Sequence, residues 1–211
     1  MVEDLTFYTP EQVFNDLKTK FSSTSVPSLM KELKRSSNKE DRELFYGAVF
    51  STGLRYVTKH DYHLKTASNE PADIEVLDKT LNEQNQDIPK SKRQTDHWIA
   101  QNVSITEHVM KEKINKGVNN FYRIIKEHLI KTKLSKKAGD YRGCILVFHL
   151  KLNLRGKADI RILRKKIREI KQDNFEQIWI TGFRSKKFDE CFITELLYYN
   201  LPLLYYPISI I

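Results

Sequence analysis

The sequence predicts a mixed α/β sandwich, with helices packed on a sheet that is antiparallel in its first part and parallel in its second. Three segments with strand-like alternation follow one another before residue 110, and segments with helical spacing alternate with strand-like segments after it. Consecutive strands favour an antiparallel meander, whereas strands separated by helices favour parallel pairing. Both arrangements are therefore expected in one sheet.

Three helices are predicted before the first strand. Thr9, Pro10 and Gln12 form a capping box with proline at the first helical position, so a helix starts at residue 10 and ends before the serine-rich stretch 22–28. A second, short helix is predicted at 28–35. Asn38 caps the third, 39–57, which has acids in its first turn and apolar residues at helical spacing. We expect residues 1–38 to form a helical extension of a domain that spans 39–211.

The three predicted strands lie at 60–67, 71–78 and 98–109, where apolar or β-branched residues alternate with polar ones. Residues 79–96, between the second and third strands, are rich in Asn, Gln, Lys and Asp and have little apolar content. We expect a long, mobile surface loop there.

The pattern changes beyond residue 110. Apolar residues recur every three or four positions at 110–129, which predicts a long amphipathic helix with a lysine-rich outer face. The continuous apolar run at 143–152 is typical of a strand that is covered on both faces. The remaining predicted elements are a basic helix at 160–172, a strand at 175–183, a helix at 188–200 and a strand at 202–210.

The positive charge is confined to one part of the chain. The formal net charge is +9, but residues 111–171 hold 19 Lys and Arg against 5 Asp and Glu, while the parts before and after that block are slightly acidic. Positive charge concentrated in one block beside acidic residues favours a polyanionic partner. A pair of lysine-rich helices that only face solvent is the alternative.

Several classes of protein lack support in the sequence. No apolar run is long enough to span a bilayer, and the N-terminus is acidic where a secretory signal is basic, so we expect a cytoplasmic protein with no membrane partner. The two cysteines, Cys144 and Cys191, lie in apolar segments and are expected to be buried free thiols. Glycine-rich nucleotide-binding motifs and the GxSxG nucleophile elbow are absent, which leaves nucleotide cofactors and α/β-hydrolase chemistry without support.

Acidic residues interrupt the second predicted strand. Asp73 and Glu75 are two positions apart, so both side chains point to one face of an extended chain. Glu107 stands at the end of the third strand, and the three carboxylates converge at one edge of the sheet if these strands are neighbours. Two or three oxygen ligands with open positions for water and phosphate suit Mg²⁺. Protection of an edge strand against aggregation is the other interpretation of these acids.

Residues 39–185 resemble the PD-(D/E)xK nuclease superfamily in element order and in two motifs. The segment 71–73 (PAD) is similar to the first motif with one residue inserted, and 104–109 (SITEHV) is similar to the second through Glu107. Glu43 matches an acid that many members carry on the helix before the meander. The resemblance implies a restriction-endonuclease-like three-layer sandwich, in which a mixed central sheet is flanked by helices. It also implies Mg²⁺ or Mn²⁺ held by Asp73, Glu75 and Glu107.

One position departs from the family pattern. The motif lysine is expected at position 109, which is Val109. Some members carry that lysine on the following helix, so the resemblance implies Lys111 or Lys113 as its replacement. His108 is another candidate for proton transfer. Without a replacement, the site binds metal and does not cleave, or does neither.

The sequence therefore predicts a metal-dependent nuclease, acting on DNA in restriction, repair or defence. The catalytic candidates are Asp73, Glu75, Glu107, Lys111, Lys113 and Glu43. Candidates for phosphate contacts come from the basic block, namely Lys116, Arg123, Lys126, Arg161, Arg164 and Lys165. The alternative is a non-catalytic module on the same fold that binds nucleic acid or an acidic protein. Homodimer formation and a protein partner stay open.

Overall fold

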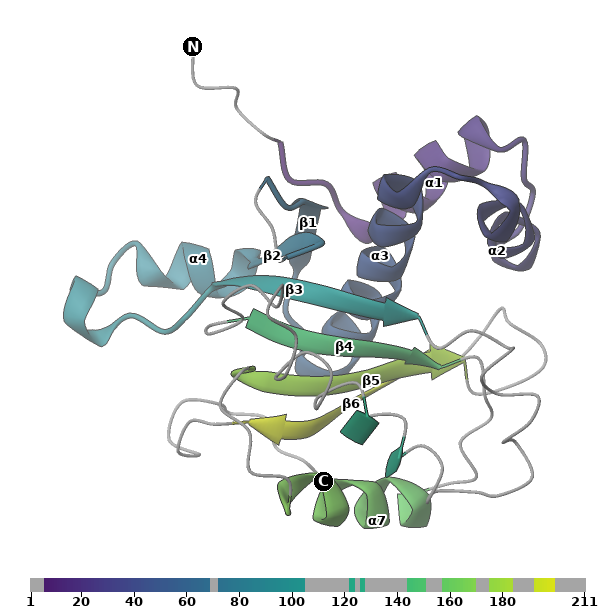
Figure 1. Cartoon of the computed structure of the whole chain (residues 1–211). Helices are drawn as coiled ribbons and strands as arrows, with labels where there is room; N and C mark the ends of the chain where they lie inside the picture. Colours follow the sequence, from purple (N-terminus) through teal and green to yellow (C-terminus); the bar gives the residue numbers. More distant parts are fainter. Residues whose placement is uncertain are drawn as a thin grey trace.

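The computed structural model contains one six-stranded open sheet with helices packed on it (Figure 1). It describes residues 6–68, 72–104, 122–123, 126–127, 144–150, 157–169, 175–183 and 192–199. The strands lie across the sheet in chain order, from β1 at one edge to β6 at the other. None of the described helices combines the length and the apolar composition needed to cross a membrane. The predicted α/β class with a mixed sheet is confirmed.

Three helices precede the sheet, α1 (Pro10–Lys20), α2 (Val26–Arg35) and α3 (Lys39–Thr58). At the start of α1, the Thr9 hydroxyl accepts a hydrogen bond from the Gln12 N–H at 3.2 Å, and the Gln12 side chain accepts one from the Thr9 N–H at 2.7 Å. At the start of α3, the Asn38 side chain accepts from the Glu40 N–H at 3.0 Å. Such caps satisfy N–H groups that have no partner inside the helix. The three predicted helices are confirmed.

The antiparallel part of the sheet consists of β1 (Tyr62–Thr66), β2 (Ile74–Asp78) and β3 (His97–Ser104). Leu64, Ile74 and Val76 face α3 and are fully buried. Gly47 allows α3 to lie close to this face, because a Cβ at that position would be 2.8 Å from both Leu64 and Ile74. The predicted meander is confirmed.

The N-terminal segment pairs with the outer edge of β1. Tyr8 and Leu64 form an isolated antiparallel bridge with two N–H to carbonyl hydrogen bonds of 2.8 Å. Phe7 lies beside the sheet, with the Lys65 ammonium 4.7 Å from its ring centre.

The parallel part of the sheet consists of β3, β4 (Cys144–Leu150) and β5 (Gln177–Phe183), and β6 (Phe192–Tyr199) adds antiparallel to β5. Every side chain from Cys144 to His149 is buried, so β4 is covered on both faces, as its apolar run predicts. α7 (Lys157–Arg168) packs against β6 and buries Leu163 and Ile167. Cys144 is a buried free thiol, as predicted, and Cys191 lies outside the described residues.

The first two helices share a core with α3 and β1. Apolar side chains of α1 and α2 pack with Phe45, Ala48 and Val49 of α3 and with Leu64. The helices are also tied by an ion pair of 2.8 Å between Lys20 and the buried Asp41. The described part of the predicted extension therefore packs on α3 and on Leu64 at the edge of the sheet.

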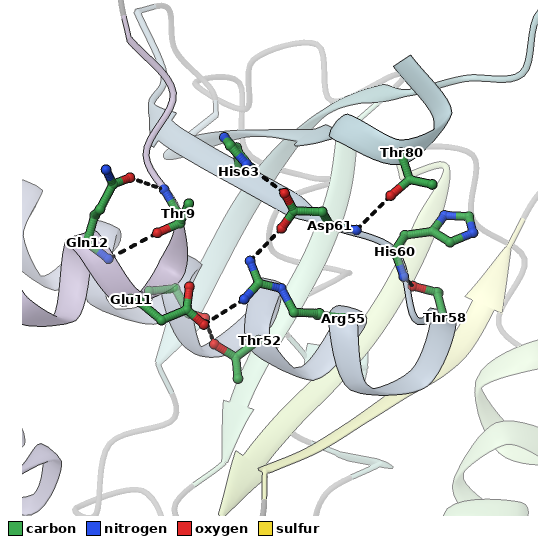
Figure 2. A network of polar contacts seen from close by, with 11 residues as sticks. Thr9, Glu11, Gln12, Thr52, Arg55, Thr58, His60, Asp61, His63 and Thr80 are labelled. Atoms are coloured by element: carbon green, nitrogen blue, oxygen red, sulfur yellow. Dashed lines mark hydrogen bonds and ion pairs between the residues drawn. The ribbon is translucent and has the colours of Figure 1, made fainter. Parts of the chain in front are cut away.

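Arg55 joins three elements through exposed and half-buried polar contacts (Figure 2). Its guanidinium lies 2.6 Å from Glu11 of α1 and 2.7 Å from Asp61, which precedes β1. The Asp61 N–H donates to the Thr80 hydroxyl at 2.9 Å. Residues of α1, α3 and the β1 entry are therefore fastened to the segment that follows β2.

The predicted mobile loop at 79–96 is wrong for much of its length. This segment contains α4 (Lys79–Asn85) and the short 3₁₀ helix η1 (Lys90–Lys92). The Asp78 side chain caps α4 by accepting from the Leu81 N–H at 2.9 Å, and buried Asn85 forms two hydrogen bonds with the backbone of Gln94. The polar side chains that suggested mobility satisfy backbone groups instead.

The predicted helix at 188–200 is also wrong where the structure describes it, because residues 192–199 form β6. The pairing with β5 runs from Phe183 opposite Phe192 to Gln177 opposite Tyr199, with one irregularity at Ile178. Aromatic and β-branched residues favour a strand, and pairing with a distant segment decides between two patterns that the apolar residues fit equally. The predicted strand at 202–210 and most of the predicted helix at 110–129 lie outside the described residues.

Candidate functional site

Two of the predicted acids contact one cation where the first turn of α3 meets the start of β2. The Lys39 ammonium lies 3.0 Å from Glu43 Oε1 and 3.8 Å from Asp73 Oδ1. The Lys39 side chain is 72% exposed, whereas those of Glu43 and Asp73 are only 15% and 11% exposed. The Asp73 N–H donates to the Ala100 carbonyl of β3 at 2.9 Å, which fixes its backbone. Two shielded carboxylates therefore already attract one positive charge.

Glu75 interacts with other basic side chains. Its Oε2 lies 3.3 Å from Lys65 Nζ and 3.0 Å from His97 Nε2. Lys65 stands directly opposite Glu75 in the register, and strand alternation places both on the face away from α3. The ring of Phe7 lies edge-on to His97, with centroids 5.8 Å apart. Glu75 thus contacts Lys65 and His97, whereas Asp73 contacts Lys39, and their joint action on a metal ion stays a prediction.

The Glu43 and Asp73 oxygens suit Mg²⁺ or Mn²⁺, which prefer hard oxygen donors. Within the described ranges, no group of three or more potential metal ligands is found. Mg²⁺ nevertheless accepts one or two carboxylates when water and substrate phosphate fill the remaining positions. The pair therefore fits such an ion as a partial ligand set.

The predicted third ligand, Glu107, lies outside the described residues. The described part of β3 ends at Ser104 and meets Asp73 at Ala100, which precedes Glu107 by seven positions. The other predicted residues outside the described ranges are His108, Val109, Lys111, Lys113 and Lys116. Their roles stay predictions.

The remaining predicted phosphate-contact residues lie in three described segments, 122–123, 126–127 and 157–169. Arg123 forms an ion pair of 3.0 Å with Glu127, one helical turn away. Lys126 places its ammonium 5.9 Å from the centre of the Tyr122 ring. On α7, Arg161 and Lys165 are exposed, and Arg164 is half-buried.

His60 and His63 are held by different carboxylates. His60 Nδ1 lies 2.7 Å from the buried Asp78, and His63 Nε2 lies 2.9 Å from Asp61, as Figure 2 shows for His63. The two histidines are three positions apart in the sequence, as some pairs of metal ligands are. In the structure each contacts a carboxylate beside β1 instead. The weak metal signal of these two residues therefore receives no support.

His149 on β4 is a notable residue that sequence reasoning did not single out. Its ring packs on Tyr46 of α3, with centroids 4.5 Å apart, and burial lowers the pKa of His149 from 6.5 to about 3. The imidazole is therefore neutral at physiological pH. Tyr46 follows Glu43 by three positions and lies on the same side of α3. A single histidine inside an apolar run is the only sequence signal, and it does not separate a core residue from a functional one.

Comparison of this chain with protein-family models, with curated proteins and with solved structures finds no match.

Proposed function

We propose that this protein hydrolyses phosphodiester bonds in nucleic acid, DNA in particular, with a divalent metal ion bound at Glu43 and Asp73. The observation that carries the proposal is the contact of one ammonium with both shielded carboxylates. The order of the sheet, in which a meander pairs in parallel with the next strand, supports a restriction-endonuclease-like arrangement. The 19 Lys and Arg against 5 acids at 111–171 support a polyanionic substrate.

In this proposal, Glu43 and Asp73 hold the ion, and Glu107 is the predicted third ligand. The bound ion supplies Lewis-acid polarisation of the phosphate and a water with lowered pKa. Lys39 is exposed, and beside a bound phosphate its ammonium would neutralise developing charge. Lys39 therefore joins Lys111 and Lys113 as a candidate for the lysine that Val109 does not supply.

Mn²⁺ binding tests the site directly and is measured by titration calorimetry on the full chain. We expect Asp73→Asn and Glu43→Gln each to weaken binding strongly, because each removes one of two anionic donors. Lys39→Gln should strengthen it, since the ammonium competes with the metal ion for the same oxygens. The matched controls are Asp87→Asn and Glu83→Gln, which change exposed acids near α4. Equal Mn²⁺ affinity in all five variants would refute the proposed metal site.

Cleavage tests the reaction. Wild type and Asp87→Asn should cut plasmid and oligonucleotide DNA in Mg²⁺ or Mn²⁺, whereas Asp73→Asn should not. Absence of metal-dependent cleavage by the wild type over several metals and substrates would refute the proposed phosphodiesterase activity. Equal cleavage by wild type and Asp73→Asn would refute the role of Asp73 as a metal ligand.

A non-catalytic nucleic-acid-binding module is the second candidate. It is favoured by the ion pairs that engage Glu75 and by Val109 at the position where the family carries its lysine. This candidate predicts binding without cleavage, with an affinity that falls steeply as salt rises. Binding that does not respond to salt would indicate a protein partner instead.

A further inference from the structure

We infer that a surface made by Tyr122, Lys126 and the outer side of α7 binds single-stranded nucleic acid. Its members, called here the Tyr122 surface, are Tyr122, Lys126, Arg161, Ile162, Lys165 and Lys166. The choice of nucleic acid as ligand rests on the proposed function, and the side chains of this surface specify that the nucleic acid is single-stranded. Bases would lie on its aromatic and aliphatic side chains, and phosphates on its cations.

Two lysines from distant parts of the chain meet at one aromatic ring. The ammonium groups of Lys126 and Lys166 lie 5.9 and 5.3 Å from the centre of the Tyr122 ring. Attraction to the electron-rich ring holds each cation near it, so Tyr122 gathers positive charge from two segments. Glu127, the acid on the same segment as Lys126, is engaged by Arg123. Lys126 is exposed, so a ligand can bring negative charge to its ammonium beside the ring.

The outer side of α7 continues this surface. Arg161 and Lys165 are exposed, lie one helical turn apart and pair with no carboxylate among the described residues. Ile162 is 46% exposed, although Leu163 and Ile167 already provide the buried side of the helix. Ile162 precedes Lys166 by four positions, so the two are neighbours on the helix surface. An aliphatic side chain thus lies among cations, next to the lysine that contacts Tyr122.

This combination of side chains favours single strands over a duplex. A single strand offers unstacked bases with apolar faces together with its phosphates, and proteins bind it through a cationic groove with aromatic residues. A duplex hides the faces of its bases and would use the cations alone. A half-buried tyrosine ring and an exposed isoleucine within a basic face match the first ligand.

The inference is tested by fluorescence anisotropy with a labelled oligothymidine, a duplex of equal length and heparin, a polyanion without bases. The protein is full-length Asp73→Asn in EDTA, so neither metal binding nor cleavage affects the readout. We expect oligothymidine to bind tighter than the duplex or heparin. Tyr122→Leu and Ile162→Ser should each weaken oligothymidine binding about five-fold or more and leave heparin binding unchanged. Tyr122→Phe should keep the wild-type affinity.

Charge removal gives the matched comparison. The double variant Arg161→Gln/Lys165→Gln should bind all three ligands more weakly. For oligothymidine, the slope of log affinity against log salt concentration should fall in magnitude by about 0.7 for each lost phosphate contact. Lys90→Gln/Lys92→Gln removes two exposed charges from η1 and should change nothing. Tighter duplex binding, or equal binding of heparin and oligothymidine with no effect of Ile162→Ser, would overturn the inference. Ile162 is exposed, so this variant keeps the test valid if Tyr122→Leu fails to fold. Either result leaves the proposed metal site to be judged by its own experiments.

Discussion

Replacing Gly47 by alanine tests how closely α3 approaches the sheet, which is the contact that brings Glu43 to Asp73. The new methyl group would lie 2.8 Å from Cδ1 of both Leu64 and Ile74, whereas carbon atoms pack at about 3.5–4.0 Å. Both partners are fully buried, so neither side chain has free space to turn into. The overpacking costs about 1–3 kcal/mol, and alanine recovers about 1 kcal/mol of helix propensity. We therefore expect a net loss of about 1 kcal/mol.

Urea unfolding followed by circular dichroism measures this loss, and for a chain of this size it corresponds to a fall in melting temperature of about 2–4 °C. A double-mutant cycle with Ile74→Val sharpens the test, because valine lacks the Cδ1 atom that the new methyl group meets. The double variant should lose less than the sum of the two single losses by about 0.5 kcal/mol or more. Ile178→Val, a buried change on β5, should instead be additive with Gly47→Ala. An unchanged or higher midpoint for Gly47→Ala would refute the close approach.

Three further predictions concern other contacts. The pKa of His149 is 6.5 in the unfolded chain and about 3 in the folded chain, so the unfolded chain binds a proton more readily. The stability that neutral His149 supports is therefore complete above pH 6.5 and is lost as the pH falls towards 3. His149→Gln should therefore reduce the loss of unfolding free energy between pH 7 and pH 5 by about 2 kcal/mol in urea titrations, and an unchanged pH dependence would contradict this. Asp78→Ala removes the cap of α4 and should cost about 1–3 kcal/mol, whereas Asp78→Asn keeps an acceptor and should cost less; equal losses would argue against the cap. Arg55→Gln should cost less than about 1 kcal/mol, because its two carboxylate partners are about half exposed, and a larger loss that persists in high salt would disagree.

Local signals predicted much of the fold. The capping box at Thr9 and the cap at Asn38 mark the starts of α1 and α3, and the apolar run of β4 indicates a strand buried on both faces. One prediction failed where a distant contact decides the structure, because residues 192–199 become a strand on the edge that β5 offers. The other failed on a local signal, because Asp78 caps the helix at 79–85 and the polar composition of that segment was interpreted as a loop.

The candidate site was predicted in part. Glu43 and Asp73 were both expected, and the structure brings them to one ammonium. Glu75 was expected on the same face as Asp73 by alternation; the structure places it beside Lys65 and His97, and its role as a metal ligand stays a prediction. Lys39 was missed, because a lysine at the start of a surface helix looks like any solvated lysine until the fold places it next to an acid from another element.

The bridge between Tyr8 and Leu64 has a consequence for how this protein associates. β1 is the outermost strand on its side of the sheet, and Tyr8 occupies both hydrogen-bonding groups of Leu64. A chain cut after Tyr8 would offer those groups to a strand of another molecule, and exposed strand edges are common starting points for self-association. The short segment before α1 thus covers the part of this edge at Leu64 where a strand of another molecule would otherwise pair.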